Sequence, residues 1–405
     1  MKIQQMDVKG AYLNGILQEK IHMHQPEGFD DGSGKVCQLV KTLYGLKQSG
    51  REWNKELDQQ LKEKEFTNLK SDPCTYIRRT KDELEIITVW VDDLLLFTLT
   101  ERSMSNLKAE LQSLFEITDM GDPAKIVGIE INRTEETLTI SQKQYILAIL
   151  KSEGMQDANP VSTPLDPNIK LEQNPVGTQG NRSNAYAMLL GKLQYLATAT
   201  RPDIAYAVNR LASYTANPSL THYTAAKRIL RYLKGTKNFE LTYKQVPDQQ
   251  TFYGYSDAAY ANTDDYKSTS GYVFLAGGAA ITWGSRKQTT IALSSTEAEY
   301  IALSEASREA MWLRHLYGEL GYIQEKPTLL IGDNNGSIAM AKNPQFHKQT
   351  KHVEIHWHWV RNLVQDGLIT INSCRDPEQT ADILTKSLLR QKHAKHTKEL
   401  GLSTV

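Results

Sequence analysis

Apolar and polar residues follow one another in the first 150 residues as short strands between helices. Residues 1–25 predict a strand, a short connection and a second strand, whereas residues 42–66 carry apolar side chains at helical spacing. The apolar run from Ile86 to Phe97 predicts two buried strands joined by a tight hairpin turn. This half is completed by a helix over 103–115, a strand and hairpin over 126–141 and a helix over 145–150.

The second half changes character twice. Four prolines among Asn, Gln and Gly residues make 158–181 typical of a linker, and helices are expected to resume over 184–233. After Phe252 the pattern is that of a strand meander. It is followed by a long helix over 294–320, a short strand over 328–335 and a final helix over 379–388. The sequence therefore predicts an α+β or α/β multidomain fold.

Composition places the chain among ordinary globular proteins. Its 405 residues allow roughly two to four domains, and 40% of them are hydrophobic and 23% charged. No run approaches the ~18 apolar residues of a membrane helix, and the first ten residues lack the apolar core of a signal peptide. Cys37, Cys74 and Cys374 are far apart and lack metal-ligand spacing. We therefore expect an intracellular protein without a membrane partner, a disulfide framework or a zinc site.

The formal net charge is zero, so any attraction to nucleic acid has to be local. Two stretches concentrate basic residues: the first holds Lys227, Arg228, Arg231, Lys234 and Lys237, and the second holds Lys386, Arg390, Lys392, Lys395 and Lys398. Such stretches are most often solvated helix faces, and a phosphate-binding surface is the alternative.

Asp92 and Asp93 interrupt the long apolar run, which is a costly place for charge. An Asp-Asp pair is a good turn former, and most such pairs only turn the chain. A hairpin turn would nevertheless bring both carboxylates to one edge, where they repel unless they are protonated or bridged by a cation. Asp7 is the candidate third carboxylate of a two-metal site for phosphoryl transfer.

A second group of acids lies after Phe252. Asp257 is near the middle of a predicted strand, Asp333 ends another, and Asp382 lies in the expected final helix. Glu297 and Glu299 occupy the first turn of the long helix. Each acid alone has a structural explanation, yet four carboxylates at these positions can converge on one sheet edge and hold a pair of divalent ions.

Several long, ordered motifs carry a family resemblance over essentially the whole chain: MDVKGAYLNGILQEKIHMHQPEGF, LYGLKQSGREWN, VWVDDLLLF and LSSTEAEYIALSEASREAMWL. They resemble the reverse transcriptase and ribonuclease H portion of a copia-type retrotransposon polyprotein. The resemblance implies a reverse transcriptase palm and thumb remnant, a helical connection and a ribonuclease H-like mixed-sheet domain. The corresponding ranges are 1–160 for palm and thumb, 161–248 for linker and connection, 249–390 for ribonuclease H and 391–405 for a C-terminal tail.

For the polymerase site, the resemblance implies metal-binding and catalytic roles for Asp7, Asp92 and Asp93. Tyr12 matches the aromatic residue beneath the nucleotide sugar, where it disfavours a 2′-hydroxyl; from the pattern alone it would be a half-buried strand aromatic. Gln48 matches a residue near the incoming nucleotide, framed by Gly45 and Arg51. Gly128 falls in the region that resembles the primer grip.

For the ribonuclease H site, the resemblance implies catalytic metal ligands at Asp257, Glu299, Asp333 and Asp382. Glu299 is preferred to Glu297, which stays open as the alternative, because Glu-Tyr-Ile-Ala matches the family pattern. Many ribonucleases H place a histidine in the loop before the last acid, but here that loop reads SCRDPEQTAD. Any role of that histidine is therefore absent or supplied by another residue.

The implied enzyme is an RNA-directed DNA polymerase and a hybrid-cleaving ribonuclease H, with two Mg²⁺ ions per site and Mn²⁺ as an alternative. Its implied partners are an RNA template, a DNA primer, an RNA–DNA hybrid and deoxynucleoside triphosphates. The expected location is a cytoplasmic virus-like particle, with the nucleus as the alternative. The sequence does not indicate an oligomeric state.

One departure from the family concerns the start of the chain. Asp7 lies almost at the N-terminus, whereas family members have a fingers region before the first acid; no protease or integrase motif is found either. We expect a truncated frame that polymerises poorly and retains ribonuclease H activity. The alternatives are a non-catalytic nucleic-acid-binding remnant and a metal-dependent phosphohydrolase of small molecules.

Overall fold

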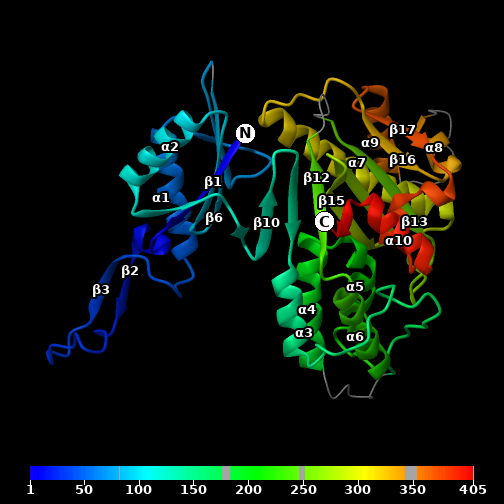
Figure 1. Ribbon diagram of the computed structural model, residues 1–405, viewed down its shortest axis with the longest axis horizontal. Coiled ribbons are helices and arrows are strands. Elements are labelled where there is room, and N and C mark those ends of the chain that lie inside the picture. Colours follow the sequence, from blue (N-terminus) through cyan, green and yellow to red (C-terminus); the bar gives the residue numbers. More distant parts are fainter. Residues whose placement is uncertain (82, 176–182, 246–250, 343–353, 405) are drawn as a thin grey trace. The chain divides into compact units, whose positions relative to one another are not determined.

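The computed structural model describes the chain except for residues 82, 176–182, 246–250, 343–353 and 405 (Figure 1). The chain divides into two compact units, Met1–Val127 and Gly128–Val405. This division lies earlier than the predicted boundary after residue 160, because the strands after Gly128 join a sheet of the second unit. Packing does not assign functional roles, so the functional domain boundaries stay a prediction.

The first unit is built on a six-stranded sheet in the order β4-β5-β6-β7-β1-β8, with antiparallel neighbours throughout. The expected hairpin between two buried strands is confirmed as β6 and β7. The strands of the sheet are β1 (Lys2–Val8), β4 (Thr67–Asn68), β5 (Thr75–Arg79), β6 (Leu84–Trp90), β7 (Asp93–Thr98) and β8 (Ile117–Gly121). The turn η1 (Ala11–Asn14) leads to a separate ribbon of β2 (Ile16–Met23) and β3 (Cys37–Lys41).

Two helices, α1 (Ser49–Glu63) and α2 (Glu101–Leu114), pack on one face of this sheet. Side chains alternate along a strand, so Met6 and Val8 of β1 enter the core beneath the helices while Asp7 points to the opposite face. The helix predicted over 42–66 begins later, at Ser49, because the preceding residues form the turns that lead into it.

The second unit contains a sheet with the strand order β18-β12-β11-β10. Its strands are β10 (Ile129–Arg133), β11 (Thr137–Ser141), β12 (Phe239–Lys244) and β18 (Leu402–Thr404), whereas the short strand β9 (Lys125–Ile126) belongs to the first unit. The core beside it is formed with α3 (Lys143–Ser152), α4 (Ser183–Ala199), η2 (Pro202–Ile204), α5 (Ala205–Ala212) and α6 (Leu220–Gly235). The helices expected over 145–150 and 184–233 are thereby confirmed.

The proline-rich segment lacks regular structure over the described residues 158–175, but it is not a free linker. Leu165 and Leu171 are buried in the core of the second unit. The Arg231 guanidinium donates from Nε to the carbonyl of Asn159 over 2.7 Å. The prolines break secondary structure here, while the leucines still anchor the segment to the helices.

The second sheet of this unit is mixed and has the order β15-β14-β13-β16-β17. The meander is antiparallel, and β16 pairs in parallel with both β13 and β17. The strands are β13 (Tyr253–Ala259), β14 (Thr269–Ala276), β15 (Ala279–Lys287), β16 (Thr328–Gly332) and β17 (Ile369–Ser373). The helices that accompany it are α7 (Ser295–Glu319), α8 (Asn335–Lys342) and α9 (Glu354–Gln365).

The prediction of a final helix over 379–388 is wrong. This segment instead forms the 3₁₀ turn η4 (Thr380–Leu384), which follows η3 (Asp376–Glu378). Thr385 is the C-cap of this turn, and its hydroxyl donates to Asp257 of β13. The last helix is α10 (Arg390–Glu399), and the edge strand β18 (Leu402–Thr404) follows it where a tail was expected.

None of the helices in the described part of the chain combines the length and the apolar character that crossing a lipid bilayer requires.

A fully buried ion pair holds the helices of the second unit together. The Arg201 guanidinium donates to the Asp203 carboxylate over 2.9 and 2.7 Å, and to the Thr236 hydroxyl over 2.7 Å. The Tyr232 hydroxyl donates to the same carboxylate over 2.6 Å. Arg201, Asp203 and Tyr232 are buried, so loss of one charge would leave the other without compensation.

We expect Arg201→Ala to lower the free energy of unfolding of the second unit by about 3–5 kcal/mol, because the Asp203 carboxylate would be buried alone. Urea unfolding followed by circular dichroism measures this loss. The exposed Lys151→Ala variant on α3 is the control and should shift the transition by less than about 0.5 kcal/mol. Equal effects of the two substitutions would contradict the expectation.

Candidate active sites

The first candidate site lies at the turn between β6 and β7. Asp93 opens β7 and is paired in register with Asp7 of β1, so the two side chains project from the same face. Asp92 lies in the turn itself, and its carbonyl accepts the backbone N–H of Val8 over 2.8 Å. The structure thus brings all three predicted acids to one edge of the sheet.

This turn has a strained backbone that is held from outside. Val91 has a φ of 58°, a left-handed conformation that a β-branched residue rarely adopts. The Trp53 indole N–H of α1 donates to the Val91 carbonyl over 2.7 Å. The Gln5 amide donates to Asp93 Oδ1 over 2.9 Å. Neighbouring elements therefore hold the acid turn in place, as is common at functional sites.

Electrostatics agrees with this proximity. Burial raises the pKa of Asp7, and the carboxylates of Asp92 and Asp93 raise it further. All three side chains are half-buried, so they stay accessible to an ion from solution. A divalent cation at this edge would relieve the mutual repulsion.

The residues expected to contact a nucleotide form a second group around the start of α1. The ring of Tyr12 in η1 lies 4.9 Å from that of Tyr44. Gln48 donates to Glu19 of β2 over 2.6 Å, and Arg51 pairs with the same carboxylate over 3.4 Å. The pairing of Arg51 and Gln48 with Glu19 was not expected from the sequence. Their nucleotide-binding role stays a prediction.

Gly128, in the region resembling the primer grip, sits in a tight turn between β9 and β10. Its φ is 75°, and a Cβ there would lie 3.0 Å from the Tyr195 hydroxyl. Both observations exclude a larger side chain at this position. They do not test a contact with a primer.

The second candidate site is an acidic cluster, which we define as Asp257, Asp333, Asp382 and Glu299. Carboxylate oxygens of the three aspartates lie within 4.8 Å of one another. Asp257 lies on β13, Asp333 directly follows β16, and Asp382 lies in η4. The parallel pairing of β13 and β16 places the carboxyl ends of both strands at the same edge.

Glu299 and Glu297, both near the start of α7, make different contacts. Glu299 accepts the backbone N–H of Ala258 on β13 and interacts with Asp257 and Asp333. Glu297 accepts the backbone N–H of Leu293 over 2.8 Å, and its own N–H bonds to Ser294, the N-cap. Glu297 is thus a helix cap. Glu299 is the residue that joins the aspartates.

The negative charge of the acidic cluster is not fully compensated by nearby positive side chains. Burial raises the pKa of Asp257 to about 7, against the opposing effect of Lys386. Burial, followed by the carboxylates of Asp257 and Asp333, raises the pKa of Glu299 to about 9. Burial raises the pKa of Asp333 as well. Oxygen donors at this density are the ligands that Mg²⁺ and Mn²⁺ prefer, so these residues fit such an ion.

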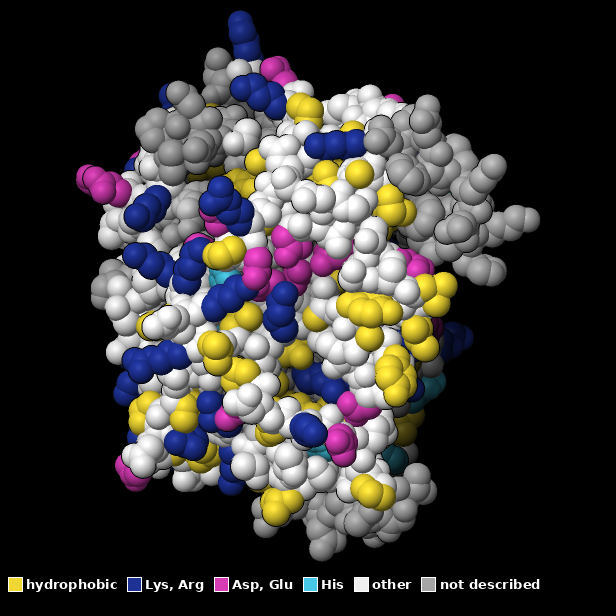
Figure 2. All heavy atoms as spheres, turned by 90° about the vertical axis from the view of Figure 1, so that its right-hand side faces the viewer, with side chains coloured by type: hydrophobic (Ala, Val, Ile, Leu, Met, Phe, Trp, Pro, Cys, Tyr) yellow, Lys and Arg dark blue, Asp and Glu magenta, His cyan; other side chains and the backbone are white. Residues whose placement is uncertain are grey.

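Two lysines contact the cluster directly. Lys386 lies 2.6 Å from one oxygen of Asp382 and 3.6 Å from Asp257, and Lys392 contacts the other oxygen of Asp382. Partial burial opposes charge on Lys386, yet Asp257 and Asp382 outweigh it and raise the pKa of that lysine. Figure 2 shows a face on which acidic side chains gather beside Lys and Arg side chains.

The sequence placed these lysines in a basic stretch, read as a solvated face or a phosphate surface, and missed their contact with the acids. One signal was available, because Lys386 follows Asp382 by four residues, the spacing of neighbours on one helix face. Thr385, which donates to Asp257, was missed too. No pattern in the sequence indicated this contact, because the position of Thr385 depends on the 3₁₀ turn, which was not predicted.

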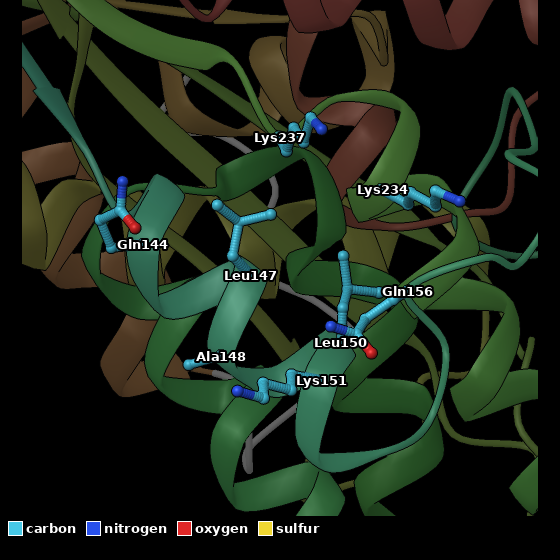
Figure 3. Close-up of a pocket in the computed structure, with 8 residues that line it drawn as sticks. All are labelled: Gln144, Leu147, Ala148, Leu150, Lys151, Gln156, Lys234 and Lys237. Atoms are coloured by element: carbon cyan, nitrogen blue, oxygen red, sulfur yellow. The ribbon is translucent and has the colours of Figure 1, made fainter.

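The other basic stretch, on α6, has a mixed role. Arg228 donates to the Thr163 hydroxyl over 3.0 Å and helps to hold the proline-rich segment. Lys234 and Lys237 instead line a pocket of about 410 Å³ between α3 and α6, opposite Gln144 and Lys151 (Figure 3). The lysine side chains that line this pocket attract anionic ligands.

We expect Glu299→Gln to raise the melting temperature of the metal-free protein at pH 8 by about 3 °C or more, and to change it little at pH 5. A carboxyl whose pKa is raised on folding costs stability as pH rises from its ordinary pKa towards the raised one, and glutamine removes that cost. Differential scanning calorimetry in EDTA measures the shift. The control Glu297→Gln should show no gain at pH 8, and a gain of Glu299→Gln equal at both pH values would contradict the expectation.

Comparisons with known proteins identify the family of the chain. Residues 1–167 match the family described as reverse transcriptase (RNA-dependent DNA polymerase). The chain is 38% identical to the Retrovirus-related Pol polyprotein from transposon TNT 1-94 of Nicotiana tabacum, over 97% of this chain and 30% of the relative. It is also 33% identical to the putative transposon Ty5-1 protein of Saccharomyces cerevisiae, over 75% of this chain and all of the relative.

A solved structure shares the fold. The foamy viral protease-reverse transcriptase in complex with RNA/DNA hybrid matches with a TM-score of 0.53 at 12% identity, over 92% of this chain and 44% of that one. The chain spans less than a third of the length of the tobacco polyprotein. It belongs to the reverse transcriptase family of copia-type retrotransposon Pol polyproteins.

Proposed function

We propose that the chain carries two sites for phosphoryl transfer. The first unit holds an RNA-directed DNA polymerase site, and the second holds a ribonuclease H site that cleaves the RNA strand of an RNA–DNA hybrid. The observation that carries the proposal is the acidic cluster, in which oxygens of three aspartates from separate elements lie within 4.8 Å. A fold has little structural reason to gather three carboxylates, two of them fully buried, from a strand, a loop and a 3₁₀ turn.

At the ribonuclease site, this chain's residues hold and orient the ligands. The Thr385 hydroxyl fixes Asp257, and the Ala258 N–H fixes Glu299, so that both carboxylates face Asp333. Divalent ions bound there would activate a water molecule and neutralise charge on the scissile phosphate. The protein contributes position and charge, and no covalent step passes through a side chain.

At the polymerase site, Asp7, Asp92 and Asp93 would hold the ions that activate a primer 3′-hydroxyl and neutralise the triphosphate. Support comes from the register of Asp7 opposite Asp93 and from the raised pKa of Asp7, whose causes are burial and then the other two acids. We assign Tyr12 to the sugar of the incoming nucleotide. Gln48 and Arg51 would line the same subsite.

We also propose that the substrates are nucleic acids: an RNA template, a DNA primer and an RNA–DNA hybrid, with deoxynucleoside triphosphates as the monomers. Lys151, Lys234 and Lys237 around the pocket of Figure 3 would contact phosphates, because lysines gain affinity there without reading sequence. A protein that only binds nucleic acid, or one that hydrolyses small phosphate esters, would behave differently in the tests below.

We expect Asp333→Asn to reduce Mg²⁺-dependent cleavage of an RNA–DNA hybrid by about 10²-fold or more, because an amide supplies less charge to the ions. Gel analysis of a labelled RNA strand measures the rate. The matched control is Asp366→Asn, since Asp366 is exposed after α9 and lies outside the acidic cluster. It should cleave at the wild-type rate.

The same assay separates the alternatives. Wild-type protein that binds the hybrid without cutting it would indicate a non-catalytic remnant. Inhibition of hybrid cleavage by free nucleotides, with their faster hydrolysis, would indicate a small-molecule phosphohydrolase. Equal cleavage by wild type and Asp333→Asn would remove the proposed site.

We expect Asp93→Asn to abolish Mg²⁺-dependent extension of a DNA primer on an RNA template while hybrid cleavage is retained, because the two sites lie in different units. Primer extension with labelled primer gives the first rate and the hybrid assay gives the second. Glu63→Gln at the exposed end of α1 is a control with the same charge change. Loss of both activities in Asp93→Asn would contradict two independent sites.

A further inference from the structure

Asp382 is fully buried, and each of its two carboxylate oxygens is contacted by a different ammonium group. Lys386 contacts Oδ1 over 2.6 Å, and Lys392 contacts Oδ2. A divalent ion that binds Asp382 must therefore share an oxygen with a lysine or displace it. Positive charges repel each other at such distances, so sharing is costly.

The two lysines differ in what else they hold. Lys392 also pairs with Asp376 over 2.7 Å and is anchored on α10. The ion-pair partners of Lys386 within the described residues are both members of the acidic cluster, Asp382 and Asp257. Its side chain is 39% exposed and follows η4 in a segment without regular structure. Lys386 is therefore the cation that can leave towards solvent.

We propose that Lys386 is an internal counterion of the acidic cluster that competes with the divalent ions. In the metal-free protein its ammonium neutralises Asp257 and Asp382, and it withdraws when ions bind. Lys386 thereby sets the concentration of Mg²⁺ at which the site fills. The inference rests on the proposed metal site, and it gives Lys386 a positioning and regulatory role without making it a catalytic residue.

The proposed role of Lys386 also bears on the histidine that the loop before Asp382 lacks. The loop before Asp382 contains no histidine, so a mobile cationic side chain near the metals has to come from elsewhere. Lys386 lies on the other side of Asp382, four residues later, and reaches the same carboxylates. An ammonium group differs from an imidazole because it stays charged throughout the neutral range.

Mg²⁺ titration of the full-length chain tests the proposal, with thermal unfolding as the readout. All variants carry Asp93→Asn, which removes one of the three carboxylates proposed for the polymerase site and so weakens that site as a second binder of Mg²⁺. We expect Lys386→Met to lower the melting temperature in EDTA and to lower the half-saturating Mg²⁺ concentration about tenfold or more. Lys386→Arg keeps the charge and should behave as the parent protein does.

Controls separate a counterion from a structural lysine. Lys395 lies on the same helix as Lys392 and pairs with Glu399 over 3.6 Å, so Lys395→Met should leave the half-saturating concentration unchanged. If Lys386 only stabilised the fold, Lys386→Met would lower the melting temperature equally with and without Mg²⁺. That result would overturn the proposal. Lys386→Gln, which is smaller and polar, provides the same measurement if the methionine variant does not fold.

The outcomes also distinguish this proposal from the proposed function. If the parent protein is not stabilised by Mg²⁺ or Mn²⁺ at any concentration, the metal site itself is absent and both proposals fail. If the parent protein binds Mg²⁺ and Lys386→Met binds it with unchanged affinity, the counterion role alone fails. Isothermal titration calorimetry at pH 8 provides the affinities independently of unfolding.

Discussion

Like charges that are gathered in a buried place require cations, and this constraint organises the second unit. Asp257 and Asp382 are 1% and 0% exposed, and their oxygens lie within 4.8 Å of those of Asp333. Such a cluster persists only if the surrounding fold stabilises it. Threonine and backbone donors hold the carboxylates in position, while the two lysines supply charge. The pKa values of Asp257 and Glu299 are raised, first by burial, which agrees with incomplete compensation by these partners.

The first unit meets the same constraint with different means. Its acids lie at a hairpin turn and are half-buried, so water supplies part of the compensation that lysines supply in the second unit. Instead of counterions, the first unit provides rigid support: Trp53 and Gln5 hold the turn, and Val91 accepts a left-handed backbone. In both sites, carboxylates on neighbouring strands come together at one sheet edge, and in the second unit η4 and α7 add Asp382 and Glu299 to them.

The sequence predicted the elements whose patterns are local. The β6–β7 hairpin was predicted from the apolar run around Asp92 and Asp93, and α7 was predicted as a long helix over 294–320. Patterns that depend on distant partners were missed. The segment around Asp382 has a helical pattern, but it forms a 3₁₀ turn whose C-cap, Thr385, bonds to Asp257, 128 positions away. The proline-rich composition of 158–175 predicted a linker, but Leu165 and Leu171 in this segment pack against helices. Composition alone does not reveal such tertiary contacts.

The edge strand β18 has a consequence for how the chain is made. It pairs with β12, so Leu402–Thr404 complete a sheet whose other strands in the second unit begin at Ile129. A ribosome must therefore translate past residue 404 before this sheet can close, whereas residues 1–127 contain all strands of the six-stranded sheet. Long-range pairing of this kind slows folding and leaves strand edges exposed meanwhile. The first unit can therefore fold during synthesis, whereas the second unit cannot be completed until its last strand has been made.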